Sequence, residues 1–242
     1  MAARYLTIVP LPGPARLTPD ALGRAAPWFP VIGLGIGAVL VATERATQVI
    51  FPLLLGGLLT VTAWKLLTGG LHLDGLADCL DGLGGRDPEH RLAIMRDSRI
   101  GAFGALGLIL LLLLEIAALT ELPSGVQARA LLVVPAVARA TPPLLARLFP
   151  PARREGLGAA FGAGVGALAA PIALSVALVV AIVALRTLGI VVVIVAVASA
   201  LIVTRFFVAR VSGITGDVLG AAIELAELAG LLTVSAWSHL ER

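Results

Sequence analysis

The sequence predicts an all-α fold: a polytopic integral membrane bundle of about seven transmembrane helices. Of the 242 residues, 59% are hydrophobic and 14% are charged, and the mean hydropathy is +1.02. The apolar residues form runs that are too long and too numerous for the core of one soluble domain. Because these runs lack the alternation of a transmembrane strand, we expect helices, which satisfy their backbone hydrogen bonds internally within a bilayer.

Seven apolar segments predict the individual spans. They cover residues 30–42, 49–67, 101–119, 130–149, 171–185, 188–204 and 218–237. The first and the fifth segments are short for a complete crossing. We expect a single membrane domain over residues 1–242, with a cytoplasmic motif loop at about 68–100.

The basic residues predict the orientation. Most of the 18 Lys and Arg residues fall on the same side as the N-terminus, among them Lys65, Arg96, Arg99 and Arg153. By the positive-inside rule this side is cytoplasmic, which places the C-terminus outside. The net charge of +3 suits the anionic inner leaflet and indicates no nucleic-acid partner.

Three carboxylates interrupt the apolar pattern in the run H-L-D-G-L-A-D-C-L-D-G, residues 72–82. Asp74, Asp78 and Asp81 have the spacing i, i+4, i+7, which places them on one face of a helix. Acids at this spacing commonly form a solvated face, but here the residues between them are apolar and no lysine follows to pair with them. We therefore predict that they bind a hard cation with oxygen ligands, most simply Mg²⁺.

Gly75 and Gly82 each follow one of these aspartates directly. Without a side chain, a glycine allows close approach of either a phosphate or another helix. His72 precedes the cluster and is a candidate for substrate contact, although a single histidine is more often structural.

A second polar patch precedes the third span. Arg96, Ser98 and Arg99 are candidates for binding phosphate oxygens, for which guanidinium groups are geometrically suited. The alternative is an ordinary cytoplasmic anchor of the membrane boundary. Asp97, within the same patch, is a candidate general base.

The last span begins with acidic residues of its own. Asp217 and Glu224 are seven residues apart and share a helix face. An acid within a span needs a basic partner, a metal ion or an aqueous cavity, so both are candidate site residues. Asp217 is a candidate for metal binding and for proton transfer, whereas Glu224 is a candidate substrate contact. Arg139, within an apolar span, can pair with a substrate phosphate or with one of these carboxylates, and Arg154 adds a charge to a further cytoplasmic turn.

Four separated motifs resemble the cobalamin synthase, or adenosylcobinamide-GDP ribazoletransferase, family. The motifs are G-G-L-H-L-D-G-L-A-D-C-L-D-G at 69–82, I-M-R-D-S-R-I-G at 94–101, R-E-G-L-G at 154–158 and T-G-D-V-L-G-A-A-I-E-L at 215–225. The first motif is also distantly similar to the aspartate motif of CDP-alcohol phosphotransferases, but the arginine and the second aspartate pair of that motif are missing.

The resemblance implies an enzyme of the prokaryotic cytoplasmic (inner) membrane, with its active site facing the cytoplasm. Its expected reaction joins GDP-activated cobinamide to α-ribazole, or to its 5′-phosphate, and releases GMP with Mg²⁺ as cofactor. Asp74, Asp78, Asp81 and Asp217 would hold the metal, while Arg96 and Arg99 would bind phosphate. Association with a second copy, or with other corrinoid-pathway enzymes, is compatible with this expectation.

Two other classes stay open from the sequence. A CDP-alcohol or polyprenyl phosphotransferase would use similar acids but a lipid acceptor. An ion-coupled transporter would also use acids in the membrane, but it predicts repeated halves and broken helices near the bilayer midplane, whereas these motifs cluster at cytoplasmic ends.

Overall fold

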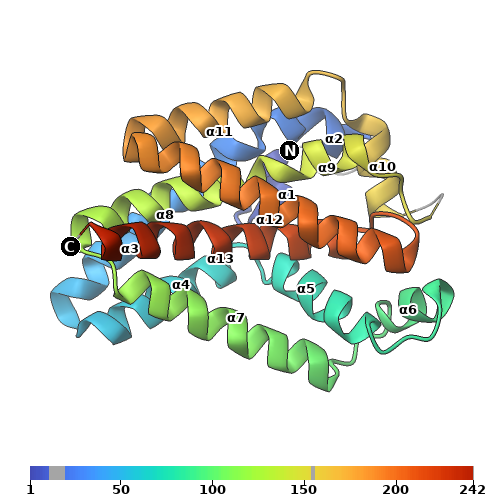
Figure 1. Ribbon diagram of the computed structural model, residues 1–242, viewed down its shortest axis with the longest axis horizontal. Coiled ribbons are helices and arrows are strands. Elements are labelled where there is room, and N and C mark those ends of the chain that lie inside the picture. Colours follow the sequence, from blue (N-terminus) through green and yellow to red (C-terminus); the bar gives the residue numbers. More distant parts are fainter. Residues whose placement is uncertain (11–19, 154–155, 242) are drawn as a thin grey trace.

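The computed structural model describes residues 1–10, 20–153 and 156–241, and all regular secondary structure within them is helical (Figure 1). The helices are α1 (Ala2–Leu6), α2 (Ala21–Ala25), the 3-10 turn η1 (Ala26–Trp28), α3 (Phe29–Ile50), α4 (Leu53–Leu67), α5 (Leu71–Gly82), α6 (Pro88–Ile94), α7 (Ala102–Thr120), α8 (Ser124–Arg139), α9 (Thr141–Leu148), α10 (Leu157–Gly164), α11 (Ala169–Leu185), α12 (Thr187–Val211) and α13 (Gly216–Leu240). The predicted all-α membrane fold is confirmed. Within the described residues, five helical segments are long and apolar enough to cross a membrane, and the number rises to seven if each of two bent helix pairs counts as one span.

The first bent pair consists of α4 and α5, whose axes differ by 88°. Gly69 and Gly70 join the two helices with φ values of 65° and 66°. This left-handed conformation is open to glycine but unfavourable for other residues, so the glycine pair produces the bend. The predicted span at 49–67 corresponds to α4, and the expected motif loop contains two helices, α5 and α6.

The other span boundaries differ from prediction at proline residues and charged residues. Helix α3 reaches Ile50, beyond the predicted end at residue 42, because Glu44 is buried within the bundle and does not mark a surface. The predicted span at 130–149 is divided into α8 and α9, where Pro142 and Pro143 occupy the first turn of α9. A second bent pair, α10 and α11 with an angle of 89°, accounts for the short span predicted at 171–185.

Helices α8 and α13 form the centre of the bundle, because most of the residues in their apolar stretches are buried. Helices α7, α11 and α12 cover them and expose apolar side chains such as Leu113, Val183 and Ile202 on the outside, as expected for contact with lipid. The motif-bearing helices α5 and α6 lie at one end of the bundle, and the C-terminus lies at the other (Figure 1).

Candidate active site

The acidic helix α5 packs directly against the start of α13. A Cβ atom added to Gly75 would lie 2.8 Å from the carbonyl oxygen of Asp217 and 2.9 Å from its Cα atom. One turn further along α13, a Cβ atom on Gly220 would lie 3.2 Å from the Cα atom of His72. A glycine here could allow close approach of a phosphate or of another helix, and the structure shows the close approach of a helix. This contact brings the acids of α5 beside Asp217.

Three carboxylates form a negative cluster at this contact. Asp74, Asp81 and Asp217 all lie close enough to Asp78 to act on it electrostatically. Asp217 Oδ2 accepts a hydrogen bond of 3.1 Å from the hydroxyl of Thr215. Within the described residues, no salt bridge joins Asp74, Asp78 or Asp217 to a basic side chain. We call Asp74, Asp78 and Asp217 the acid cluster.

Asp81 has a different role, because its carboxylate caps the N-terminus of α7. Asp81 Oδ2 accepts a hydrogen bond of 2.7 Å from the backbone N–H of Gly101, and Oδ1 accepts one of 2.8 Å from that of Gly104. A Cβ atom on either glycine would collide with the carboxylate, which explains the glycines of this segment. A metal role for Asp81 stays a prediction, but this geometry favours capping.

A loop contact places Arg153 near the acid cluster. The backbone N–H of Ala152 donates to the carbonyl oxygen of Ile214 at 2.9 Å, and Ile214 N–H donates to Pro150 at 2.8 Å. Partial burial and the nearby charge of Arg96 lower the pKa of Arg153, and Asp217 acts in the opposite direction. The residue predicted from the sequence as a substrate contact in this turn is Arg154, which lies outside the described residues. The signal for Arg153 was present, since it stands beside Arg154 in the same turn.

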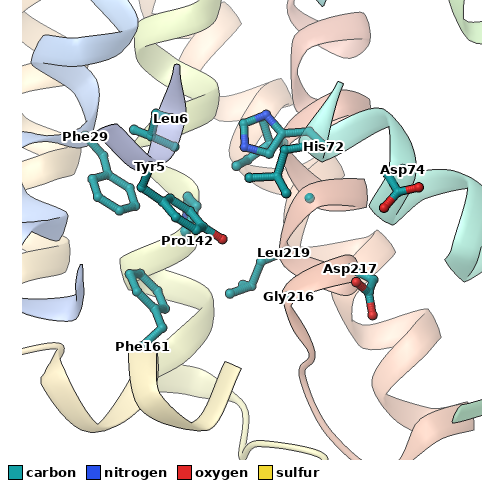
Figure 2. Close-up of a pocket in the computed structure, with 13 residues that line it drawn as sticks. Tyr5, Leu6, Phe29, His72, Asp74, Pro142, Phe161, Gly216, Asp217 and Leu219 are labelled. Atoms are coloured by element: carbon teal, nitrogen blue, oxygen red, sulfur yellow. The ribbon is translucent and has the colours of Figure 1, made fainter. Parts of the chain in front are cut away.

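Two pockets meet at Gly216 and Asp217. One is lined by Arg153, Gly156, Gly158, Ala159 and the segment from Ile214 to Asp217. We call it the arginine pocket. The other contains about 570 Å³ of empty space, part of it open to solvent, and is lined by aromatic residues, His72, Asp74 and Asp217. We call it the aromatic pocket (Figure 2). The aromatic pocket was not predicted from the sequence, because the residues that line it come from distant parts of the chain.

The Arg96–Arg99 patch lines neither of the two pockets. Arg96, Ser98 and Arg99 are exposed. Arg99 Nε donates to Asp97 Oδ1 at 3.0 Å, and Nη2 donates to Asp97 Oδ2 at 2.5 Å. These hydrogen bonds lower the pKa of Asp97 to about 2, which makes it a weak proton acceptor at neutral pH. The predicted phosphate contacts of these three residues remain untested.

Arg139 and Glu224 lie in a buried ion network and line neither pocket. Lys65 Nζ is 2.9 Å from Glu115 Oε1, 2.6 Å from Glu224 Oε2 and 3.1 Å from Glu227 Oε2. Arg139 pairs with Glu227, so its partner is a carboxylate of the same helix as Asp217 and Glu224. Lys65 was counted from the sequence with the basic residues of the cytoplasmic side, but in the structure it belongs to this buried network, with a side chain that is only 8% exposed.

Comparison with known proteins decides the family. The sequence matches the family described as cobalamin-5-phosphate synthase over residues 1–235. The chain belongs to the cobalamin-5-phosphate synthase family. A relative from Geotalea daltonii is 36% identical over 237 residues, which is 98% of this chain and 96% of the relative. Relatives from Pseudomonas aeruginosa strain UCBPP-PA14 and from Clostridium acetobutylicum are 38% and 32% identical, over 97% and 96% of this chain and 96% and 93% of their own lengths.

All three of these cobalamin-5-phosphate synthase relatives are named adenosylcobinamide-GDP ribazoletransferase, so the family is one of enzymes and the predicted membership is confirmed. No solved structure matches this chain. The family match covers every residue of the acid cluster and both pockets.

Proposed function

We propose that the protein joins GDP-activated (adenosyl)cobinamide to α-ribazole, or to its 5′-phosphate, and releases GMP. The name of the relatives, adenosylcobinamide-GDP ribazoletransferase, supports GDP-activated cobinamide as the donor and ribazole as the acceptor. The observation that carries the proposal is the acid cluster, which the contact between Gly75 and Asp217 assembles beside the arginine pocket. Carboxylates without a salt bridge can bind a cation, and a neighbouring arginine can bind phosphate oxygens. Together they suit a diphosphate substrate that carries a bound cation.

The donor atoms of the acid cluster fit Mg²⁺. Carboxylate oxygens are hard ligands, and Mg²⁺ in proteins is commonly held by one or two carboxylates together with substrate phosphates and water. Among the described residues, the only three acids with ligand atoms within 4.8 Å of one another are Glu115, Glu224 and Glu227, and these surround Lys65. The three carboxylates of the acid cluster therefore do not converge on one point in this structure, and the match to Mg²⁺ rests on the type of donor atom. Asp74 and Asp78 would hold the ion, with Asp217 facing them from α13. When bound, the ion would neutralise charge that develops on the departing phosphate.

The chain's own residues would then orient the phosphates and move one proton. A ribose oxygen of the acceptor forms a bond to the phosphorus attached to cobinamide, and the bond from that phosphorus to the GMP oxygen breaks. Asp217 is better placed than Asp97 to accept the hydroxyl proton, because it lines both pockets whereas Asp97 is engaged by Arg99. Arg153 would bind a phosphate oxygen from the arginine pocket.

The distribution of basic residues supports a cytoplasmic site in the inner membrane. Arg86, Arg91, Arg96, Arg99 and Arg153 belong to the segments around α6 and the loop before α10. These segments lie at the same end of the bundle as the end of α5, opposite the C-terminus (Figure 1). The positive-inside rule assigns that end to the cytoplasm.

The reaction is tested with the detergent-solubilised protein. We expect GDP-cobinamide, α-ribazole and Mg²⁺ to yield the coupled product and an equal amount of GMP, both detected by mass spectrometry. Chelation with EDTA should abolish the reaction, and added Mg²⁺ should restore it. Coupling to a diacylglycerol or polyprenol acceptor, with none to ribazole, would instead support the lipid phosphotransferase alternative.

Replacement of Gly75 by alanine tests the assembly of the acid cluster. The added methyl group would meet the backbone of Asp217, which cannot rotate away, so α5 and α13 must separate. A displacement of about 1 Å can reduce catalysis about 100-fold, and we expect a loss in kcat of that order. Gly35→Ala is the matched control, since a Cβ atom there meets nothing within 4 Å. Wild-type activity in Gly75→Ala would show that this helix contact does not position the site.

A further inference from the structure

The aromatic pocket has an apolar side. The rings of Phe29 from α3 and Phe161 from α10 are stacked, with centroids 5.8 Å apart and an angle of 19° between their planes. Leu6, Pro142 and Ile223 add apolar surface to the lining. In Figure 2 the two phenylalanine rings lie on the side of the pocket opposite Asp74 and Asp217. An apolar lining of this kind suits an apolar or aromatic part of a ligand.

His72 supplies an unused polar group in the same pocket. The residue is only 3% exposed, and within the described part of the chain neither ring nitrogen has a hydrogen-bond partner. Buried polar atoms in proteins are nearly always hydrogen-bonded, so an orphaned imidazole that lines a pocket points to a ligand with a complementary atom. A neutral imidazole offers one donor and one acceptor.

Tyr5 divides the apolar side from the acidic side. Its ring lies between the phenylalanines and the carboxylates, with the hydroxyl directed toward the acidic side (Figure 2). Burial and the charge of Asp217 raise the pKa of Tyr5 to about 12, so the hydroxyl stays protonated and can donate a hydrogen bond. The pocket thus changes from apolar to hydrogen-bonding to acidic along its length.

We propose that the aromatic pocket binds the base of the nucleoside acceptor, with the attached sugar directed toward Asp74 and Asp217. This inference rests on the proposed function. The benzimidazole base of ribazole is flat and bicyclic, and its one free ring nitrogen can accept a hydrogen bond from His72. The sugar would then present its hydroxyl group to the carboxylate that receives the proton.

The other parts of the two substrates fit this pocket less well. Guanine carries several donors and acceptors on its edges, and the phenylalanine side of the pocket would leave them unpaired. The corrin ring with its amide side chains is far larger than a nucleoside base, so the base is the better match for a pocket lined by a few side chains. The diphosphate belongs beside Arg153, in the arginine pocket that shares Asp217.

The test compares the binding of α-ribazole and of GDP to the solubilised full chain by isothermal titration calorimetry. We expect Phe161→Ala to weaken ribazole binding about 10-fold, because the base loses an aromatic contact, and to leave GDP affinity within about twofold. His72→Gln should also weaken ribazole binding selectively. Phe161→Leu replaces Phe161→Ala if the latter fails to fold. The matched control is Phe51→Ala, at the junction of α3 and α4 and outside the pocket lining, which should change neither affinity.

Selective loss of GDP affinity in the Phe161 variants would overturn the proposal by assigning the pocket to guanine. Unchanged ribazole affinity in folded Phe161 and His72 variants would overturn it as well. Either result would leave the proposed function standing if the wild-type protein still makes the coupled product. Absence of product from the wild-type protein with every acceptor would instead refute the proposed function itself.

Discussion

Replacement of Asp78 by asparagine is expected to reduce kcat at least about 100-fold while the protein remains folded. The substitution keeps the size of the side chain but removes a charge from a cluster that forms no salt bridge among the described residues. Repulsion from Asp74 and Asp217 decreases at the same time, so the melting temperature should stay the same or rise. Asp217→Asn should behave in the same way. Rates of product formation and thermal unfolding, measured on the same preparation, check both parts.

Asp81→Ala is the informative contrast, because this aspartate caps α7 and leaves the acid cluster intact. Loss of an N-terminal cap destabilises a protein by about 0.5 to 2 kcal/mol. We expect a lower melting temperature and substantial activity at temperatures where the variant is folded. Activity near wild type in Asp78→Asn, or an inactive but fully stable Asp81→Ala, would contradict this division of roles.

Replacement of Lys65 by methionine is expected to cause the largest loss of stability. The ammonium group is bound by Glu115, Glu224 and Glu227, all of which are buried. Methionine fills a similar volume but leaves carboxylates without their cation. Removal of one member of a buried ion pair destabilises a protein by about 3 to 5 kcal/mol, and we expect a decrease of that size in the free energy of unfolding. Titration of the detergent-solubilised protein with denaturant measures this difference.

A double variant separates the lost pairing from simple loss of packing. In Lys65→Met combined with Glu224→Gln, one of the carboxylates that lost its cation is also neutralised. The double variant should therefore lose less free energy of unfolding than the sum of the losses in the two single variants. Arg205→Met is the matched control, since Arg205 is exposed on α12. Strictly additive effects, or equal losses in Lys65→Met and Arg205→Met, would show that the network contributes little.

The fold was predictable from the sequence wherever a local pattern determines it. Apolar runs indicated the spans, and the spacing of Asp74 and Asp78 indicated a helical face, which α5 provides. The bend before α5 depends on two consecutive left-handed glycines, Gly69 and Gly70. The sequence shows the two residues, but their conformation is decided by the packing of the helices on either side.

The candidate site was only partly predictable, because many of its contacts join residues that are far apart in the chain. Lys65 pairs with Glu115 and with Glu224, which are 50 and 159 residues away. A single lysine in an apolar run, together with three acids in other spans, was the available signal for this network. By its spacing, Asp81 belongs to the acidic face of α5. In the structure its carboxylate instead accepts hydrogen bonds from the first turn of α7. The spacing of residues within α5 cannot indicate how close α7 lies.

The binding of Mn²⁺, a spectroscopic substitute for Mg²⁺, tests the central claim that the acid cluster holds a divalent ion against a diphosphate. Electron paramagnetic resonance of the solubilised protein with GDP should show bound Mn²⁺. The signal should be weakened in both Asp78→Asn and Asp217→Asn and retained in Glu115→Gln, whose carboxylate belongs to the buried network. Unchanged Mn²⁺ binding in the two aspartate variants, or its loss in Glu115→Gln alone, would contradict the account.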